Sequence, residues 1–328
     1  MRIERILCPV DLPSESDEAW RYAVSLARAY QAELVLCHCA PESRLITSHA
    51  NGAAFDGVRK ALADSLLRYV CRSDPTTPRC EVVVVDSGGD VGETIVRTAR
   101  ERRTDLVVMR SRRSGVAALL GSKAEQVSRT ASCPVLVIHP SESSNGDGDA
   151  TSPARFQRIL VSHDFSGSSE LALSYALSIA RRYKAELHLM HILPAPEEGE
   201  LEIVWNGQSV ESAYQRATRR LRNSVPEDIY AHCRVRQVVR WGRPYREVLA
   251  YAKEQNIDLV CMGALGRDFG SKALFGSNVD RVLRQSTCPV LIGRPFKPAT
   301  TALLSSRIAK PSFTSAFVSA FLTFLSLT

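Results

Sequence analysis

The stretch from Ile257 to Ser277 reads IDLVCMGALGRDFGSKALFGS and joins a strand-like run to a glycine pattern. The apolar residues before Met262 predict a buried strand, and 278–286 predicts a helix. Glycines let the backbone approach a phosphate or ribose closely, and a helix N-terminus directs N–H groups at an anion. A plain loop with glycine turns and a serine N-cap is the alternative. Three glycines at spacing G-x2-G-x9-G and the serine after them form the pattern: Gly263, Gly266, Gly276 and Ser277.

The sequence motifs of this chain occur twice. The offset between copies is 153 residues from Asp11/Asp164 to Met109/Met262, and 155 from Gly121/Gly276 onward. The only change in length therefore falls inside the glycine loop. The repeated pairs are RILCPVD 5–11 and RILVSHD 158–164, ELVLCHC 33–39 and ELHLMHI 186–192, TDLVVM 104–109 and IDLVCM 257–262, and SCPVLVI 132–138 and TCPVLIG 287–293.

Each copy alternates short β-rich runs with helical patterns. In the first copy the predicted strands are 4–10, 33–39, 80–86, 105–109 and 134–138. Continuous apolar runs indicate strands buried on both faces, and this alternation predicts a parallel α/β sheet with helices on both faces. The first helix has one apolar face in each copy, made of Ala19, Ala23, Leu26, Ala27 and Tyr30, and of Ala172, Ala176, Ile179, Ala180 and Tyr183.

The repeat predicts two domains in tandem, 1–140 and 156–295. The segment 141–155 is poor in apolar residues and rich in Ser, Gly and Asp, which is typical of a flexible linker. The tail 296–328 is rich in Ser, Thr and Phe, and its apolar part is shorter than a bilayer span. For the tail we favour a helix packed on the body or on a partner, or a disordered end, over membrane attachment.

Composition describes an ordinary globular protein. The 328 residues are 45% hydrophobic and 23% charged, with a net charge of +7. No basic patch interleaved with aromatic residues stands out, so nucleic-acid binding is not predicted. The nine cysteines show no CxxC pair, and charged residues interrupt the apolar start of the chain. Both features predict a cytoplasmic protein with free thiols.

With an Asp after the first strand and MGALGRDFGSKALFGSN at 262–278, the chain resembles the universal stress protein family in its tandem form. The resemblance covers about 3–139 and 157–294. It implies two open parallel five-stranded sheets of order 3-2-1-4-5, the nucleotide-binding alpha-hydrolase-like fold. It also implies pairing through the last strands, within the chain between Val135–Ile138 and Val290–Gly293 as an internal pseudo-dimer, or between chains as a homodimer.

In that family the glycine pattern marks the members that bind ATP. For the second copy the resemblance implies ATP, with or without Mg²⁺. Asp164 would face the adenosine, Ile192 would contact the adenine through its backbone, and Gly276 would begin the segment around the outer phosphates. His163 departs from the small residue expected there and would stack on a base or crowd it. The implied ATP-binding set is Ser162, His163, Asp164, Ile192, Met262, Gly263, Gly266, Arg267, Gly276, Ser277 and Asn278.

The first copy departs from the pattern. Its loop, MRSRRSGVAALLGS at 109–122, has Arg110 and Arg113 where the second copy has Gly263 and Gly266. A side chain at those points argues against the same backbone cradle, so we interpret the first domain as degenerate. A weak first-domain site stays open as an alternative, at Asp11, Gly121 and Ser122.

The sequence offers no identifiable catalytic residue and no metal-ligand set. Ser162, His163 and Asp164 are adjacent on a strand and would not converge as a triad. His38 and His191 occupy equivalent strand ends, which favours structural histidines. We therefore predict an ATP-binding regulatory protein of the stress response, with slow ATP hydrolysis at most. The alternative is a nucleotide-free scaffold or interaction module of the same family.

Overall fold

The computed structural model describes seven continuous ranges and a few positions within 57–64. The predicted linker 141–155 and tail 296–328 lie outside the described residues, so those predictions are not tested. The ranges are 2–10, 18–40, 79–111, 122–139, 156–194, 210–266 and 275–294.

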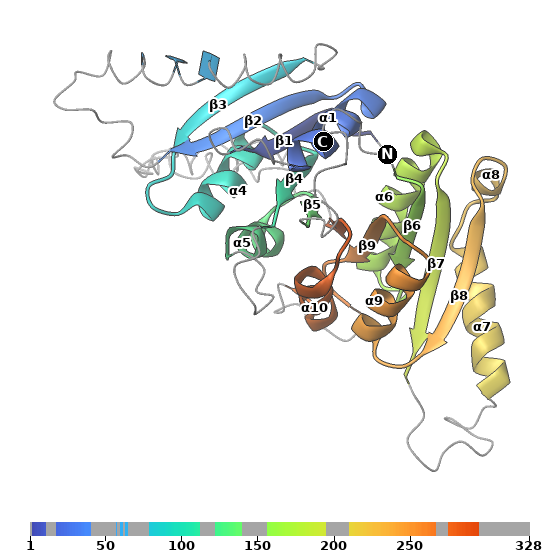
Figure 1. Cartoon of the computed structure of the whole chain (residues 1–328). Helices are drawn as coiled ribbons and strands as arrows, with labels where there is room; N and C mark the ends of the chain where they lie inside the picture. The colour runs from blue at the N-terminus through green and yellow to red at the C-terminus, as the bar shows by residue number, and fades with distance from the viewer. Residues whose placement is uncertain are drawn as a thin grey trace, which may run out of the picture. The chain divides into compact units, whose positions relative to one another are not determined.

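The first half contains the five strands expected from its apolar runs, each within one or two residues of the predicted bounds. Figure 1 labels its elements. They are β1 (Arg5–Pro9), α1 (Glu18–Tyr30), β2 (Glu33–Ala40), β3 (Cys80–Asp86), α4 (Val91–Glu101), β4 (Leu106–Arg110), α5 (Ser122–Thr130) and β5 (Val135–Ile138).

The second half repeats this order, and two helices directly precede its third strand, whereas the equivalent segment of the first half lies mostly outside the described residues. Its elements are β6 (Arg158–Ser162), α6 (Gly167–Tyr183), β7 (Glu186–Leu193), α7 (Val210–Asn223), α8 (Glu227–Tyr230), β8 (Val235–Trp241), α9 (Pro244–Glu254), β9 (Leu259–Gly263), α10 (Ser277–Gln285) and β10 (Val290–Gly293).

The strands of both halves form one ten-stranded sheet of order β3-β2-β1-β4-β5-β10-β9-β6-β7-β8. Within each half the pairing is parallel and the order is the predicted 3-2-1-4-5, which confirms the fold class. The halves join where β5 and β10 pair antiparallel, with Leu136 opposite Leu291. This confirms the predicted pairing within the chain. Each last strand now has a neighbour on both sides, so neither offers a free edge to another chain.

Helices cover both faces of the sheet in each half (Figure 1). One core lies between the sheet and α1, α6, α7 and α8, and the other between the sheet and α4, α5, α9 and α10. The predicted apolar face of the first helix is buried in both copies, except that Tyr183 is half-buried. Burial on both faces explains why the central strands are continuously apolar.

The halves also contact each other above and below the sheet. On one face, Tyr30 of α1 donates a hydrogen bond to Ser178 of α6 at 2.9 Å. Phe156, the first described residue after the predicted linker, packs its ring against Tyr22 and Tyr183. On the other face, α5 and α10 share a charge network of Glu125, Arg129, Asp280 and Arg284. Accordingly, 1–297 form one compact unit.

Candidate nucleotide-binding site

A cavity of about 570 Å³ lies at the carboxyl ends of β6, β7 and β9. This volume is within the usual range for small-molecule sites. Strand β6 lies between β7 and β9, so the order of the strands reverses at β6: later strands are added first on one side of it and then on the other. Open α/β sheets bind ligands at such switch points. Eight residues of the predicted ATP-binding set line the cavity, namely Ser162, Asp164, Ile192, Met262, Gly263, Gly266, Gly276 and Asn278.

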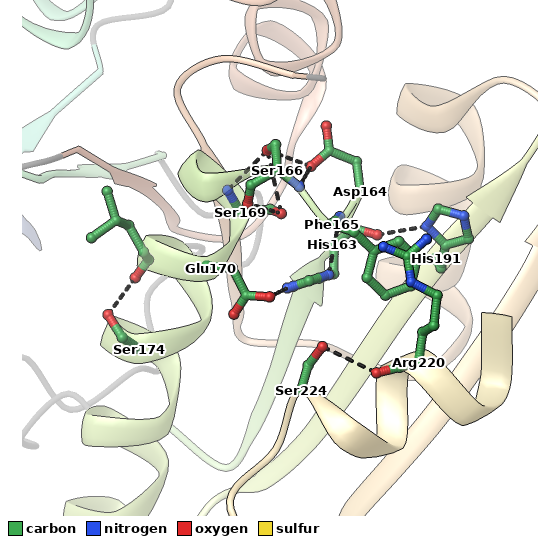
Figure 2. Close-up of polar contacts among 11 residues, drawn as sticks. His163, Asp164, Phe165, Ser166, Ser169, Glu170, Ser174, His191, Arg220 and Ser224 are labelled. Carbon is green, nitrogen blue, oxygen red and sulfur yellow. Dashed lines mark hydrogen bonds and ion pairs between the residues drawn. The ribbon is translucent and has the colours of Figure 1, made fainter. Parts of the chain in front are cut away.

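The turn from β6 into α6 is fixed by side-chain hydrogen bonds, which Figure 2 shows. Asp164 Oδ1 accepts from the Ser166 N–H at 3.0 Å and from the Ser166 hydroxyl at 2.6 Å. Ser166 is the N-cap of α6, and its Oγ accepts from the Ser169 N–H at 3.2 Å. Asp164 therefore faces the cavity and also organises the helix start, because Asx turns and N-caps satisfy N–H groups that a helix leaves open.

Phe165 lines the cavity in a backbone conformation that bulky residues rarely adopt. Its φ is +62°, in the left-handed region, where such a residue costs roughly 1–3 kcal/mol unless its surroundings hold it. The Arg220 guanidinium lies 3.8 Å from the ring centre, and the His191 ring lies at 4.5 Å. Figure 2 shows the Arg220 guanidinium over the Phe165 ring, with His191 beside them. This clamp fixes an aromatic wall beside Asp164.

His163 lies outside the cavity lining, so the structure does not support the expectation that its ring stacks on or crowds a base. Its ring is buried and points toward Glu170 of α6, as Figure 2 shows. Burial lowers the pKa of His163 to about 4, so the ring is neutral at pH 7 and its 3.3 Å approach to Glu170 is not an ion pair there. The Phe165 N–H donates to Nδ1 at 3.2 Å, which also favours the neutral ring.

Gly263 has a packing reason to be glycine in addition to the one that the motif suggests. A Cβ there would lie 2.5 Å from the Ser168 carbonyl carbon and 2.7 Å from the Ser169 nitrogen. The absent side chain thus lets the end of β9 contact the start of α6, and the Leu265 N–H then donates to the Ser168 hydroxyl at 3.2 Å. The motif position is necessary for packing as well as for access to the cavity.

Gly276 has more room and closes the glycine loop onto α10. Its N–H donates to the Ala264 carbonyl at 2.9 Å, and a Cβ would lie 3.5 Å from that oxygen, an ordinary contact. Gly276 is the N-cap of α10, and no side chain caps this helix. The first N–H groups of α10 are therefore left to another acceptor beside the cavity. Asn278 and Val279 of the first turn line the cavity, whereas Ser277 is exposed and outside the lining.

Several predicted residues fall where the structure gives no account of them. Arg267 of the second domain lies outside the described residues, as do Asp11, Arg113 and Gly121 of the first. Ser122 begins α5, but its side chain is not described. The weak first-domain site therefore remains a prediction. Arg110 ends β4 at the position of Gly263.

Sequence reasoning missed the wall of the cavity that α7 forms. Ala213 and Ala217 are buried there, and Arg216 and Arg220 project along the same helix face at a spacing of four residues. The signal in the sequence that could have indicated this wall is the helical spacing of two alanines and two arginines on one helix face. Other lining residues that were not predicted are Phe165, Ser169, His191, Leu193, Pro194, Gly242, Pro244, Leu265 and Val279.

The two strand-end histidines play the structural role that was predicted for them. His38 Nδ1 lies 2.9 Å from the Val10 carbonyl, and His191 Nδ1 lies 2.7 Å from the His163 carbonyl. These are equivalent contacts in the two halves, each joining the end of the first strand to the second. His191 additionally lines the cavity.

In the part of the chain that the structure describes, no group of three or more His, Cys, Asp or Glu side chains is arranged to hold a metal ion. None of the helices described there is long and apolar enough to cross a bilayer.

Comparison with known proteins identifies the family. The model of the universal stress protein family matches residues 2–139 and 155–294. A universal stress protein of Mycolicibacterium smegmatis is 27% identical over 88% of this chain and 97% of its own length. The structure of one from Archaeoglobus fulgidus has a TM-score of 0.60 at 21% identity, over 90% of this chain and 97% of that one. Another, solved in complex with cAMP, aligns with 43% of this chain and 98% of its own at 22% identity and a TM-score of 0.33. The chain belongs to the universal stress protein family and carries two domains of that family in one polypeptide.

Proposed function

We propose that the second domain binds an adenine nucleotide, foremost ATP, and that occupancy of this cavity regulates the part of the protein in the stress response. One observation carries the proposal. Residues separated by more than a hundred positions in the sequence, assigned to ATP by the family motif, line a single cavity at the switch point of the sheet. Such convergence is what a binding site requires and what a set of ordinary glycine turns does not need.

The two sides of the cavity suit the two ends of a nucleotide. On the β7 side, the apolar and aromatic residues Ile192, Phe165 and His191 would contact the base. On the β9 side, Gly266 would leave room for the ribose. The uncapped start of α10 would then receive the phosphates through its free N–H groups and the positive end of its dipole. Bound ATP would bring Mg²⁺ mainly through its own phosphates, as is usual for this ion.

We infer a binding protein and not a fast ATPase. Asp164 is the one carboxylate among the described lining residues, and its Oδ1 already accepts two hydrogen bonds from Ser166. A general base must be free to accept a proton from the attacking water.

We also place the protein in the cytosol, where the described cysteines, all free thiols, would stay reduced.

The test is to measure the nucleotide released from the purified full chain on denaturation, together with calorimetric binding of ATP and cAMP. We expect one adenine nucleotide site per chain. Two per chain would assign a site to the first domain as well. No release, no binding and no thermal shift with ATP would overturn the proposal and leave the scaffold function.

A charge variant at Asn278 separates binding from folding. Asn278→Glu places a negative charge in the first turn of α10, where acidic residues stabilise a helix but repel a phosphate. We expect ATP affinity to fall at least tenfold, about 1.4 kcal/mol, while the melting temperature is unchanged or slightly raised. Asn278→Gln is the matched control, and it should retain most of the affinity. Equal affinities in the two variants would contradict a phosphate at this helix start.

A further inference from the structure

Three arginines surround one tyrosine at the edge of the cavity. Arg243 precedes α9, Arg246 lies in its first turn, and Arg281 lies on α10. Arg246 Nε donates to the Tyr245 hydroxyl at 3.0 Å, and the Arg281 guanidinium lies 4.6 Å from the centre of the Tyr245 ring. Hydrogen bonds from Arg246 and Arg243 lower the pKa of Tyr245. We call Arg243, Arg246 and Arg281 the arginine cluster.

The arginine cluster has no counter-charge. Among the described residues, no carboxylate lies within salt-bridge distance of any of the three guanidinium groups, and all three residues are exposed. By contrast, Arg240 of the same region pairs with Glu247 and Glu254. Like charges gathered without a counter-ion repel one another, so the cluster is unfavourable for the folded chain alone. Functional sites are where proteins are expected to break such a local rule.

The cluster adjoins the cavity at the end where α10 begins. Gly242 and Pro244, on either side of Arg243, line the cavity, and so do Asn278 and Val279 of the α10 first turn. Arg281 follows on that helix, and side chains of a helix lean toward its N-terminus. The cluster therefore stands beyond the segment to which the proposed function assigns the phosphates.

The first domain shows that the fold does not require these charges. The equivalent positions are Asp90, Glu93 and Gln126. They make the corresponding contacts: Gln126 packs against Gly92, the counterpart of Tyr245, and its Nε2 donates to Asp90 Oδ2 at 2.7 Å. Asp90 Oδ1 accepts from the Glu93 N–H at 2.9 Å and so caps α4. The contact between α4 and α5 in the first domain is thus made with two acids and an amide, at the positions where the second domain has three arginines.

We propose that the arginine cluster binds the outer phosphates of a nucleoside polyphosphate whose base lies in the cavity, so that the second domain selects nucleotides by the length of the phosphate chain. The inference rests on the proposed function and specifies its ligand. Guanidinium groups hold phosphate oxygens through paired, charge-assisted hydrogen bonds, and an ammonium does this less specifically. A nucleotide with one phosphate, whether AMP or cAMP, would not extend to the cluster.

The experiment is calorimetric titration of the full chain with AMP, ADP, ATP and adenosine tetraphosphate. Wild-type affinity should rise with each phosphate after the first. In the triple variant Arg243→Gln, Arg246→Gln, Arg281→Gln, the ratio of ATP to AMP affinity should fall at least tenfold while AMP affinity stays within about twofold. A second triple variant, Arg243→Asp, Arg246→Glu, Arg281→Gln, imports the residues of the first domain and should lower the ratio further.

A matched control separates local contacts from net charge. Arg219, Arg222 and Arg234 are exposed, lie outside the cavity lining and have no carboxylate partner among the described residues. Changing all three to Gln alters net charge equally and should leave the ATP to AMP ratio at its wild-type value. An unchanged ratio in the cluster variant would overturn the inference, and so would an equal loss of AMP and ATP affinity. Wild-type protein that binds AMP and ATP equally well would overturn it while leaving the proposed function intact. Wild-type protein that binds neither would overturn both.

Discussion

The two domains share their packing and differ at the carboxyl ends of their strands. Residues that bury the helices and join the strands recur at equivalent positions, as the contacts of His38 and His191 show. At the loop after the fourth strand, the first domain has Arg110 where the second has Gly263. At the adjoining corner, the first domain has Asp90 and Glu93 at the positions of Arg243 and Arg246 in the second. Both domains build the same sheet with either set of residues, although Gly263 also has a packing role in its own domain. The differences agree with the proposal that the second domain is the one that binds a nucleotide.

The largest effect we expect comes from Gly263. A methyl group there would overlap the backbone of α6 at 2.5 Å, so the helix start must shift. Overpacking against backbone typically costs about 1–3 kcal/mol, and this site lies at the upper end because no flexible side chain can yield. We expect Gly263→Ala to lower the free energy of unfolding by about 3 kcal/mol in urea denaturation, and to weaken nucleotide binding as well.

Gly167→Ala is the control for that variant. Gly167 is the first residue of the same helix, and a Cβ there would meet nothing within 4 Å. Replacing this glycine should change stability by less than about 1 kcal/mol, with stabilisation favoured because the unfolded chain loses freedom. Comparable losses in the two variants would mean that the contact between β9 and α6 is not what requires a glycine at 263.

The strands and the core could be predicted from the sequence because they depend on local patterns that occur twice, whereas the strand order was implied by the resemblance to the family. The run Val82–Val85 predicted burial on two faces, but it forms the edge strand β3, where Val84 is buried and the other three residues are half-buried. The repeat made Val135–Ile138 and Val290–Gly293 equivalent last strands, and the resemblance to the family implied that they pair. The family motif then located eight cavity residues, since backbone position after a strand follows from sequence position.

The rest of the site depended on packing between distant segments. Phe165 adopts a left-handed conformation and contacts Arg220 and His191, which come from distant segments of the chain. The helical spacing of alanines and arginines on α7 could be seen in the sequence, but it does not say which part of the sheet that helix face contacts. The side chain of His163 was assigned to the cavity because its neighbours are there, yet adjacent strand residues face opposite sides.

The second comparison is between His163 and its counterpart Val10. The pKa of His163 is lowered to about 4 by burial, from 6.5 for an exposed ring. The unfolded chain therefore takes up the proton first. The stability that this group confers is full above pH 6.5 and is lost as the pH falls toward 4. We expect the free energy of unfolding to drop by about 2 kcal/mol between about pH 7.5 and about pH 5 from this residue.

His163→Val, which installs the residue of the first domain, should remove that drop in urea denaturation at the two pH values. Glu170 works in the opposite direction, because burial raises its pKa and its charged form is disfavoured in the folded state. Its contribution is expected at the acidic end of the range, and Glu170→Gln isolates it. The same pH dependence in wild type and His163→Val would show that the buried ring is not the source.

The smallest effect that we expect is the coupling energy of the ion pairs between α5 and α10, where the two domains have equivalent residues. Arg129 of α5 contacts Asp280 at 2.9 Å, and Arg284 of α10 contacts Glu125 at 2.8 Å, so the charge network joins the halves through two equivalent pairs. Each side chain is roughly a quarter to two-fifths exposed, which limits the energy of either pair to about 1 kcal/mol.

Double-mutant cycles on Arg129→Met with Asp280→Asn, and on Arg284→Met with Glu125→Gln, should give equal coupling energies of about 0.5–1 kcal/mol that shrink as salt is added. Equal values would mean that divergence stopped at the cavity and left the interface symmetric. A clearly larger coupling for the Arg129–Asp280 pair would contradict that symmetry. Asp280 belongs to the first turn of α10, so such a result would imply that specialisation of the proposed nucleotide site extends along this helix to the contact between the domains.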